Sequence, residues 1–178
     1  FQVTLERGDL DESENLARQL AEMEPEQLRG TRGLATVYEQ RGDFESATAV
    51  VRGALEPFPD NFLLYMRLVQ IERQRGNRAG EIAVYREVLE GHAHHYGILQ
   101  RLGQAQLEEN DLEGAIETFS EVVEHYPEDL NSLRRLASIE FSAGRYESAA
   151  GRLEAVLAQA PDQPELAFAL GQIQRCLL

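Results

Sequence analysis

The chain has 178 residues and is 43% hydrophobic, so it can bury a core, and its single cysteine, Cys176, excludes an internal disulfide framework. A formal net charge of −14 argues against nucleic acid as a general partner, because binding a phosphate backbone needs an excess of basic residues. No apolar run approaches the roughly 20 residues that cross a membrane, and no signal-peptide pattern is visible, so we expect no direct membrane insertion within this chain.

Two sets of residues recur with a spacing of 34 positions. The first set is Gly8, Gly42, Gly76 and Gly144, with Asn110 in the one remaining place. Glycine, and after it asparagine, tolerates the positive φ angle that ends many helices. The second set is Pro25, Pro59, Pro127 and Pro161, with Ala93 in the remaining place. Because proline cannot continue a helix, each repeat is predicted to hold two helices separated by a short turn.

In chain order, this spacing predicts the end of a first repeat at 1–27, then full repeats at 28–61, 62–95, 96–129 and 130–163. Residues 164–178 are predicted to form a terminal helix or the start of a further repeat. Asp60, Glu128 and Asp162 follow the prolines and are predicted to cap the next helix. Small residues in the first helices (Ala35, Gly103, Ala137, Gly171) and second helices (Ala47, Ala115, Ala149) predict close helix packing.

The repeat at 62–95 departs from the others. Its second helix has Arg78 and Glu81 where the repeat before it has Phe44 and Ala47, and its closing loop has lost the proline. Weaker local packing, a bend in the stack and a site specialised for a partner are all compatible with these changes.

The repeating pattern is Leu-small-x-x-Tyr at Leu34 to Tyr38, then Gly42-Asp43-Phe44, then Ala47, Ala54 and Pro59. It resembles the tetratricopeptide repeat, and the resemblance covers the whole chain. The family implies an all-α fold, a right-handed α-solenoid of antiparallel helix pairs. It also implies that the first helix of each pair lines a concave groove.

Charge is divided between the two kinds of helix. The first helices and entry fragment (1–7, 28–41, 62–75, 96–109, 130–143, 164–178) carry a net +4, and the remainder carries −18. If the first helices line the groove, that groove is mildly basic and suits an extended partner with an acidic segment. The residues expected to bind a partner there are Arg29, Arg32, Thr36, Met66, Gln70, Arg73, Gln100, Arg101, Gln104, Leu107, Arg134, Ser138 and Phe141.

The sequence GHAHHYG at 91–97 holds three of the four histidines, His92, His94 and His95. Adjacent side chains on a loop seldom chelate one ion, and His125 is not expected to converge with them. We expect a solvated loop without a bound metal, and a pH-sensitive contact is the alternative. No nucleophile has a base at a recognised spacing, and no phosphate-binding loop is present, so we expect a non-enzymatic chain without a cofactor.

These observations favour a scaffold that binds a partner protein or peptide in its groove, as part of a larger bacterial protein. All seventeen basic residues are arginine, which is typical of a GC-rich genome, and a cytoplasmic or periplasmic location is expected. One alternative is a homo-oligomer assembled through the repeat ends, favoured by the apolar tail Ile173, Cys176, Leu177 and Leu178. A second is an arm of an envelope polysaccharide or lipopolysaccharide assembly machine.

Overall fold

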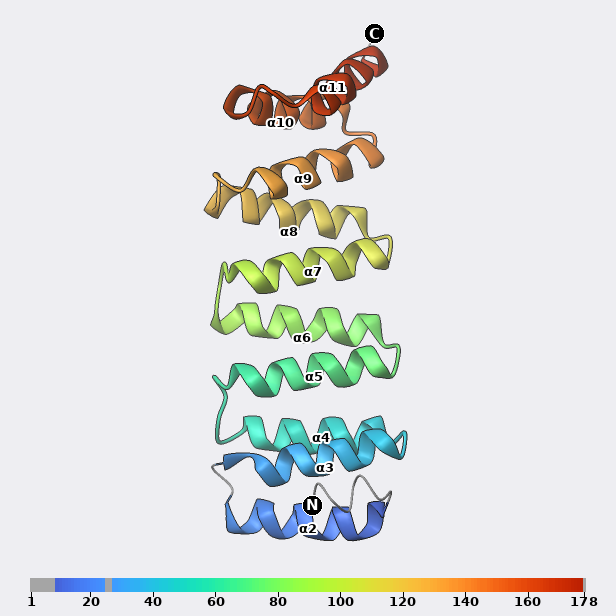
Figure 1. The fold of residues 1–178 in the computed structure, drawn as a ribbon, viewed down its shortest axis with the longest axis vertical. Helices are drawn as coiled ribbons and strands as arrows, with labels where there is room; N and C mark the ends of the chain where they lie inside the picture. Colours follow the sequence, from blue (N-terminus) through green and yellow to red (C-terminus); the bar gives the residue numbers. More distant parts are fainter. Residues whose placement is uncertain (1–8, 25–26, 178) are drawn as a thin grey trace. The chain divides into compact units, whose positions relative to one another are not determined.

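The computed structural model describes residues 9–24 and 27–177, and these residues form helices and turns without strands (Figure 1). The helices are α2 (Leu10–Met23), α3 (Arg29–Gln40), α4 (Phe44–Leu55), α5 (Phe62–Gln74), α6 (Arg78–Gly91), α7 (Tyr96–Glu108), α8 (Leu112–His125), α9 (Leu130–Ser142), α10 (Tyr146–Gln159) and α11 (Pro164–Cys176). The expected all-α fold of successive antiparallel helices is confirmed. None of the described helices is both long and apolar enough to cross a membrane.

The chain divides into two compact units, Phe1–Val84 and Tyr85–Leu178, and the division falls inside α6. In the first unit, α2 packs on α3, α3 on α4 and α4 on α5. In the second unit, each helix from α7 to α11 packs on the next one in the chain. Each unit is therefore a stack in which sequence neighbours are also neighbours in space, and the exact repeat boundaries stay a prediction.

The turns within the helix pairs follow the glycine series. Gly42, Gly76 and Gly144 have φ angles of 75°, 73° and 74°, and Asn110 has 60°. Asn110 thus adopts the same left-handed conformation as the glycines it replaces, which confirms the interpretation of the series. Gly8 and Pro25 lie outside the described residues.

The predicted helix caps were displaced by one residue. The residues that cap α5 and α9 are Asn61 and Asp129, whose side chains accept hydrogen bonds from the first backbone N–H groups of those helices. Asp60 and Glu128 instead lie within the turns that precede them. At α11 the residue immediately before the helix is Gln163 rather than Asp162, and its side chain makes no such bond. The turn after each proline therefore uses one residue more than the sequence pattern suggested.

Small residues bring the paired helices together as predicted, except in α11. Ala35 and Ala47 are both fully buried between α3 and α4. A Cβ atom added to Gly103 would lie 2.5 Å from Cε2 of Phe119, so that the ring of α8 packs directly on the backbone of α7. Gly171 in α11 is exposed, with no atom near its missing side chain.

The unusual residues of α6 form an ion pair. Glu81 is 3% exposed, and its carboxylate pairs with Arg78 one turn earlier in α6 and with Arg73 of α5, whose Nε lies 3.6 Å away. The helix is continuous, and Val84 and Tyr85 are buried along it. The Arg78–Glu81 ion pair of α6 thus occupies the place that Phe44 and Ala47 take in the preceding helix pair, and Arg73 links it to α5.

Candidate partner-binding surface

In the first unit, three predicted groove residues lie around one cavity between α3 and α5. The cavity has a volume of about 380 Å³ and is lined by Arg32 of α3 and by Met66 and Gln70 of α5. Leu28, Leu63 and Leu64 supply apolar lining. The arrangement places a guanidinium group and an amide beside an apolar surface, and such a combination can hold an extended peptide.

Arg67 also lines this cavity, but its charge is already paired. Its Nη2 lies 2.6 Å from Oε1 of Glu39 and donates a 2.8 Å hydrogen bond to the hydroxyl of Thr36, while Nη1 bonds to the amide oxygen of Gln70. Burial raises the pKa of Glu39, although Arg67 acts in the opposite direction. Thr36, a predicted groove residue, therefore forms part of a hydrogen-bonded cluster inside the unit.

Two further predicted residues of this unit do not line the cavity. Arg29 lies 3.8 Å from a carboxylate oxygen of Glu24, with its side chain 68% exposed. Arg73 is turned towards Glu81 of α6, as described above. Both arginines are solvent-accessible, and both are engaged with acidic side chains of the same unit.

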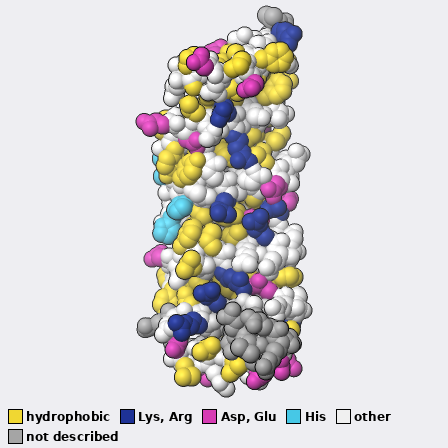
Figure 2. All heavy atoms as spheres, in the orientation of Figure 1, with side chains coloured by type: hydrophobic (Ala, Val, Ile, Leu, Met, Phe, Trp, Pro, Cys, Tyr) yellow, Lys and Arg dark blue, Asp and Glu magenta, His cyan; other side chains and the backbone are white. Residues whose placement is uncertain are grey.

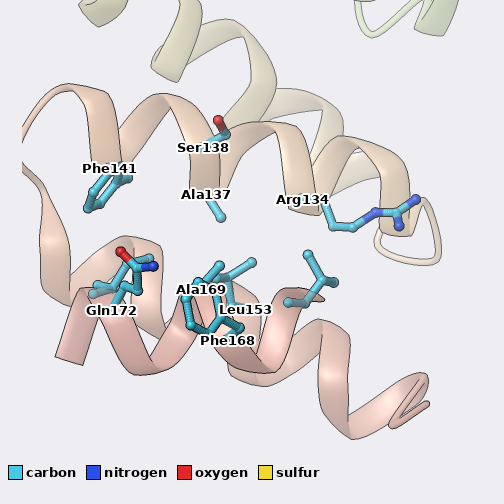
Figure 3. A pocket seen from close by; sticks show the side chains of 10 residues that line it. Arg134, Ala137, Ser138, Phe141, Leu153, Phe168, Ala169 and Gln172 are labelled. Carbon is cyan, nitrogen blue, oxygen red and sulfur yellow. The ribbon is translucent and has the colours of Figure 1, made fainter. Parts of the chain in front are cut away.

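In the second unit, a cavity of about 390 Å³ lies between α9 and α11 (Figure 3). Three predicted groove residues of α9 line it: Arg134 at one end, Phe141 at the other and Ser138 between them. The opposite wall comes from α11, where Phe168 is 67% exposed, and Leu153 of α10 is also among the lining residues. This cavity is mostly apolar with a single guanidinium at one end.

Arg134 is held in place by neutral partners. Its Nη1 donates a 3.1 Å hydrogen bond to the side-chain oxygen of Gln163, and its Nη2 donates to that of Asn131. Within residues 9–24 and 27–177, no carboxylate forms an ion pair with Arg134 or with Arg32. Both guanidinium groups can therefore receive a carboxylate from a partner.

The predicted residues of α7 have mixed surroundings. Arg101 is exposed, whereas Gln100 donates a 2.5 Å hydrogen bond to Ser132 of α9. Gln104 donates to Glu108 in the same helix, and Leu107 is half-buried against the core between α7, α8 and α9. Ser132 in turn donates to Asp129. The pKa of the Asp129 carboxyl is lowered, because burial raises it by less than the hydrogen bonds that this carboxyl accepts lower it. Arg101 is thus the most accessible of the predicted α7 residues.

The histidine loop differs from the prediction in one respect. The rings of His94 and His125 stack with their centres 3.6 Å apart, so His125 does converge with the loop. The two residues meet because His94 has a φ angle of 61° and its carbonyl accepts a hydrogen bond from Tyr126, next to His125 in the chain. The Nδ1 atom of His94 also lies 2.7 Å from Glu121. Among the described residues, no group of histidine, cysteine and acidic side chains is arranged to hold a metal ion.

Sequence reasoning missed the contribution of α11 to the second cavity. Phe168, Ala169 and Gln172 line it, but residues 164–178 were predicted to form a terminal helix or the start of a further repeat, and none of them was placed among the residues expected to bind a partner. Ile173 of the apolar tail is buried against α9 and α10, Cys176 and Leu177 are exposed, and Leu178 is outside the described residues. The 34-residue period could have identified the three lining residues of α11, because Phe168, Ala169 and Gln172 correspond to Met66, Arg67 and Gln70.

Charged and hydrophobic side chains are interspersed on the face shown in Figure 2. Arginine side chains lie among hydrophobic ones on the face shown, with acidic side chains near several of them. Some of the arginines pair with acidic residues one turn or one helix away, as in the pairs Arg75–Glu72 and Arg152–Glu140. The unpaired arginines are therefore a smaller set than the sequence count indicates.

Solved structures with the same arrangement of helices share little sequence with this chain. MamA 41-end from Desulfovibrio magneticus RS-1 is 20% identical, with a TM-score of 0.55 over 91% of this chain and 93% of its own. YrrB, described as a TPR protein with an unusual peptide-binding site, is 15% identical, with a TM-score of 0.56 over 94% of this chain and 87% of its own. A chain of the structure of Naa15/Naa10 bound to HypK-THB is 17% identical, with a TM-score of 0.70 over 96% of the present chain. The match covers 27% of the chain in that complex.

A search of curated protein sequences finds no match. The sequence pattern of the tetratricopeptide repeat, in contrast, matches overlapping windows at residues 2–62, 36–96, 66–129, 101–164 and 134–175. The windows advance by about one repeat at a time and together cover nearly the whole chain. With the helix pairs and their left-handed turns, this match shows that the chain belongs to the tetratricopeptide repeat family.

Proposed function

We propose that the chain is a non-catalytic interaction module that binds a partner protein or peptide through the exposed face of its first helices. These helices are α3 and α5 in the first unit and α7, α9 and α11 in the second. The observation that carries the proposal is that each unit has a cavity on this face lined by an arginine without an acidic partner among the described residues. Tetratricopeptide repeats generally serve as interaction scaffolds, and YrrB, a structural neighbour, is described as having a peptide-binding site.

The charge distribution supports a partner with an acidic segment. The first helices and entry fragment carry a net +4, whereas the rest of the chain carries −18. Within each unit, a carboxylate-bearing peptide is attracted to the arginines of the first helices, Arg32 in the first unit and Arg101 and Arg134 in the second, and is repelled by the acidic second helices. Thr36, Gln100 and Gln104 supply polar groups along the same helices.

The test is capture of partners from a bacterial lysate on the immobilised chain, followed by mass spectrometry. The double substitution Arg32→Glu and Arg134→Glu is expected to abolish the capture while leaving the helical content unchanged. A matched control reverses two charges on second helices, Arg52→Glu in α4 and Arg86→Glu in α6, and should retain the partners. Unchanged capture by the first variant would refute binding through this face.

Self-assembly is a second candidate, favoured by the exposed apolar side chains of α11 and of the residue that follows it. Phe168 is 67% exposed and Leu177 is 40% exposed. Exposed aromatic side chains of this size are enriched at protein interfaces. Light scattering over a range of concentrations tests this candidate: a molar mass that stays at the monomer value of 20.0 kDa would remove it.

A further inference from the structure

The two cavities are built from corresponding residues. Arg32 and Arg134 are 102 positions apart, which is three repeats of 34, and the same shift relates Met66 to Phe168 and Gln70 to Gln172. All six residues line their respective cavities. The chain therefore presents the same set, an arginine facing an apolar side chain and a glutamine, once in each unit.

The other first helices lack this set. At the position of Arg32 and Arg134, helix α5 has Met66 and helix α7 has Gln100, and Gln100 is bonded to Ser132. The recurrence is therefore not a simple consequence of the repeat, because the two intervening repeats do not carry the arginine. Among the described helices, only α3 and α9 combine this arginine with an apolar residue and a glutamine on the next first helix.

Among the positions at which the two cavities differ, that of Arg67 has the largest consequence for their shape. In the first unit, the Arg67 side chain reaches Thr36 and Glu39. The corresponding residue in the second unit is Ala169, and the cavity there extends along Ser138 to Phe141, which correspond to Thr36 and Glu39. Because Ala169 does not cover the stretch from Ser138 to Phe141 as Arg67 covers Thr36 and Glu39, the second cavity has room for a longer apolar side chain.

We propose that both cavities bind the same class of ligand: a peptide segment with an apolar side chain flanked by carboxylates. This inference rests on the proposed function and specifies its ligand. The carboxylate pairs with Arg32 or Arg134, and the glutamine amide bonds the peptide backbone. The apolar side chain lies against Met66 in the first unit and against Phe168 in the second. The second cavity takes an aromatic side chain, and the first takes a shorter aliphatic one, because Arg67 occupies the strip beyond it.

The experiment uses blocked pentapeptides and the isotope-labelled full chain, observed by NMR. The probes are Gly-Asp-Phe-Asp-Gly and Gly-Asp-Leu-Asp-Gly; the controls are Gly-Asn-Phe-Asn-Gly, which lacks the charges, and Gly-Asp-Ala-Asp-Gly, which lacks the anchor. We expect the phenylalanine probe to shift amide signals mainly around the α9/α11 cavity and the leucine probe to shift signals around both. Both controls are expected to bind about tenfold more weakly or not at all.

Each cavity serves as the control for the other. Arg32→Gln should weaken leucine-probe binding about tenfold at the α3/α5 cavity and leave the α9/α11 cavity unchanged, and Arg134→Gln should do the reverse. The double substitution Arg67→Ala and Glu39→Phe places the residues of the second cavity in the first. It should allow the first cavity to bind the phenylalanine probe, a gain that misfolding cannot produce.

Three outcomes would overturn the proposal. Equal binding of the asparagine control shows that the arginines do not recognise carboxylates, and leucine-probe signal changes at only one cavity show that the two cavities do not bind the same class of ligand. A dimer that Phe168→Ser dissociates would assign the α9/α11 cavity to a second copy of the chain. If lysate capture depends on Arg32 and Arg134 but neither probe binds, the interaction function stands and this ligand class is wrong.

Discussion

Replacing Glu81 by alanine tests whether the ion pair of α6 takes the role of an apolar contact. Glu81 is 3% exposed and pairs with Arg78, whose side chain is 28% exposed, and with Arg73, which is 56% exposed. Removing one partner of a buried pair costs about 3–5 kcal/mol. Because both arginines retain access to water, we expect the free energy of unfolding to fall by about 2–3 kcal/mol.

A second substitution should restore most of this loss. Arg78→Phe combined with Glu81→Ala places in α6 the residues that α4 carries as Phe44 and Ala47. Replacing a buried ion pair with apolar residues of suitable volume is often neutral or stabilising. The double variant is therefore expected to lie within about 1 kcal/mol of the unmodified chain, with a coupling between the two sites of about 2 kcal/mol.

The measurement is urea unfolding followed by circular dichroism for both single variants and the double variant. Glu90→Ala, at an exposed position of the same helix, is the matched control and should change stability by no more than about 0.5 kcal/mol. If the losses of the two single variants simply add in the double variant, the ion pair does not replace the apolar contact and the reasoning fails.

Four further predictions concern the pH dependence, the turns and the helix contacts. Hydrogen bonds from Arg41 and Arg18 lower the pKa of Glu14 from 4.5 to about 2, so its contribution to stability is present above pH 4.5 and is lost as the pH falls through about 2. Glu14→Gln should therefore lower the unfolding free energy by about 1 kcal/mol at neutral pH and by almost nothing near pH 2, as measured by urea unfolding at each pH. Burial raises the pKa of Glu140, so its contribution is present below pH 4.5 and is lost as the pH rises through the folded-state value; Glu140→Gln should raise the thermal midpoint at neutral pH, and a decrease there would contradict this sign. Asn110→Ala should destabilise by about 1 kcal/mol, whereas Asn110→Gly should not, because only alanine is strained at a φ of 60°; equal urea midpoints for the two would refute this account. Gly103→Ala should cost about 1–3 kcal/mol because its Cβ would meet Phe119, while Gly53→Ala in α4, with no atom within 4 Å, should be neutral or stabilising in the same assay.

The turns show how far local sequence determines the fold. A residue that must adopt a positive φ is restricted by its own side chain, so the glycine series and Asn110 could be identified without any tertiary information. The helix caps were predicted less well, since the number of residues in the turn after each proline depends on how the next helix packs. Asn61 and Asp129 therefore replaced the expected Asp60 and Glu128.

The sequence by itself determined the period, the two helices of each repeat and the family, because helical spacing and turn conformation depend on residues close together in the chain. Only the tertiary structure decided which arginines are available to a partner. Arg67 and Arg73 are paired with Glu39 and Glu81, whereas Arg32 and Arg134 have no acidic partner among the described residues. It also brought Phe168 and Gln172 of α11 into the same cavity as Arg134, and His125 onto His94. These outcomes depend on contacts and ion pairs between side chains that lie on different helices. Local sequence patterns do not specify such contacts.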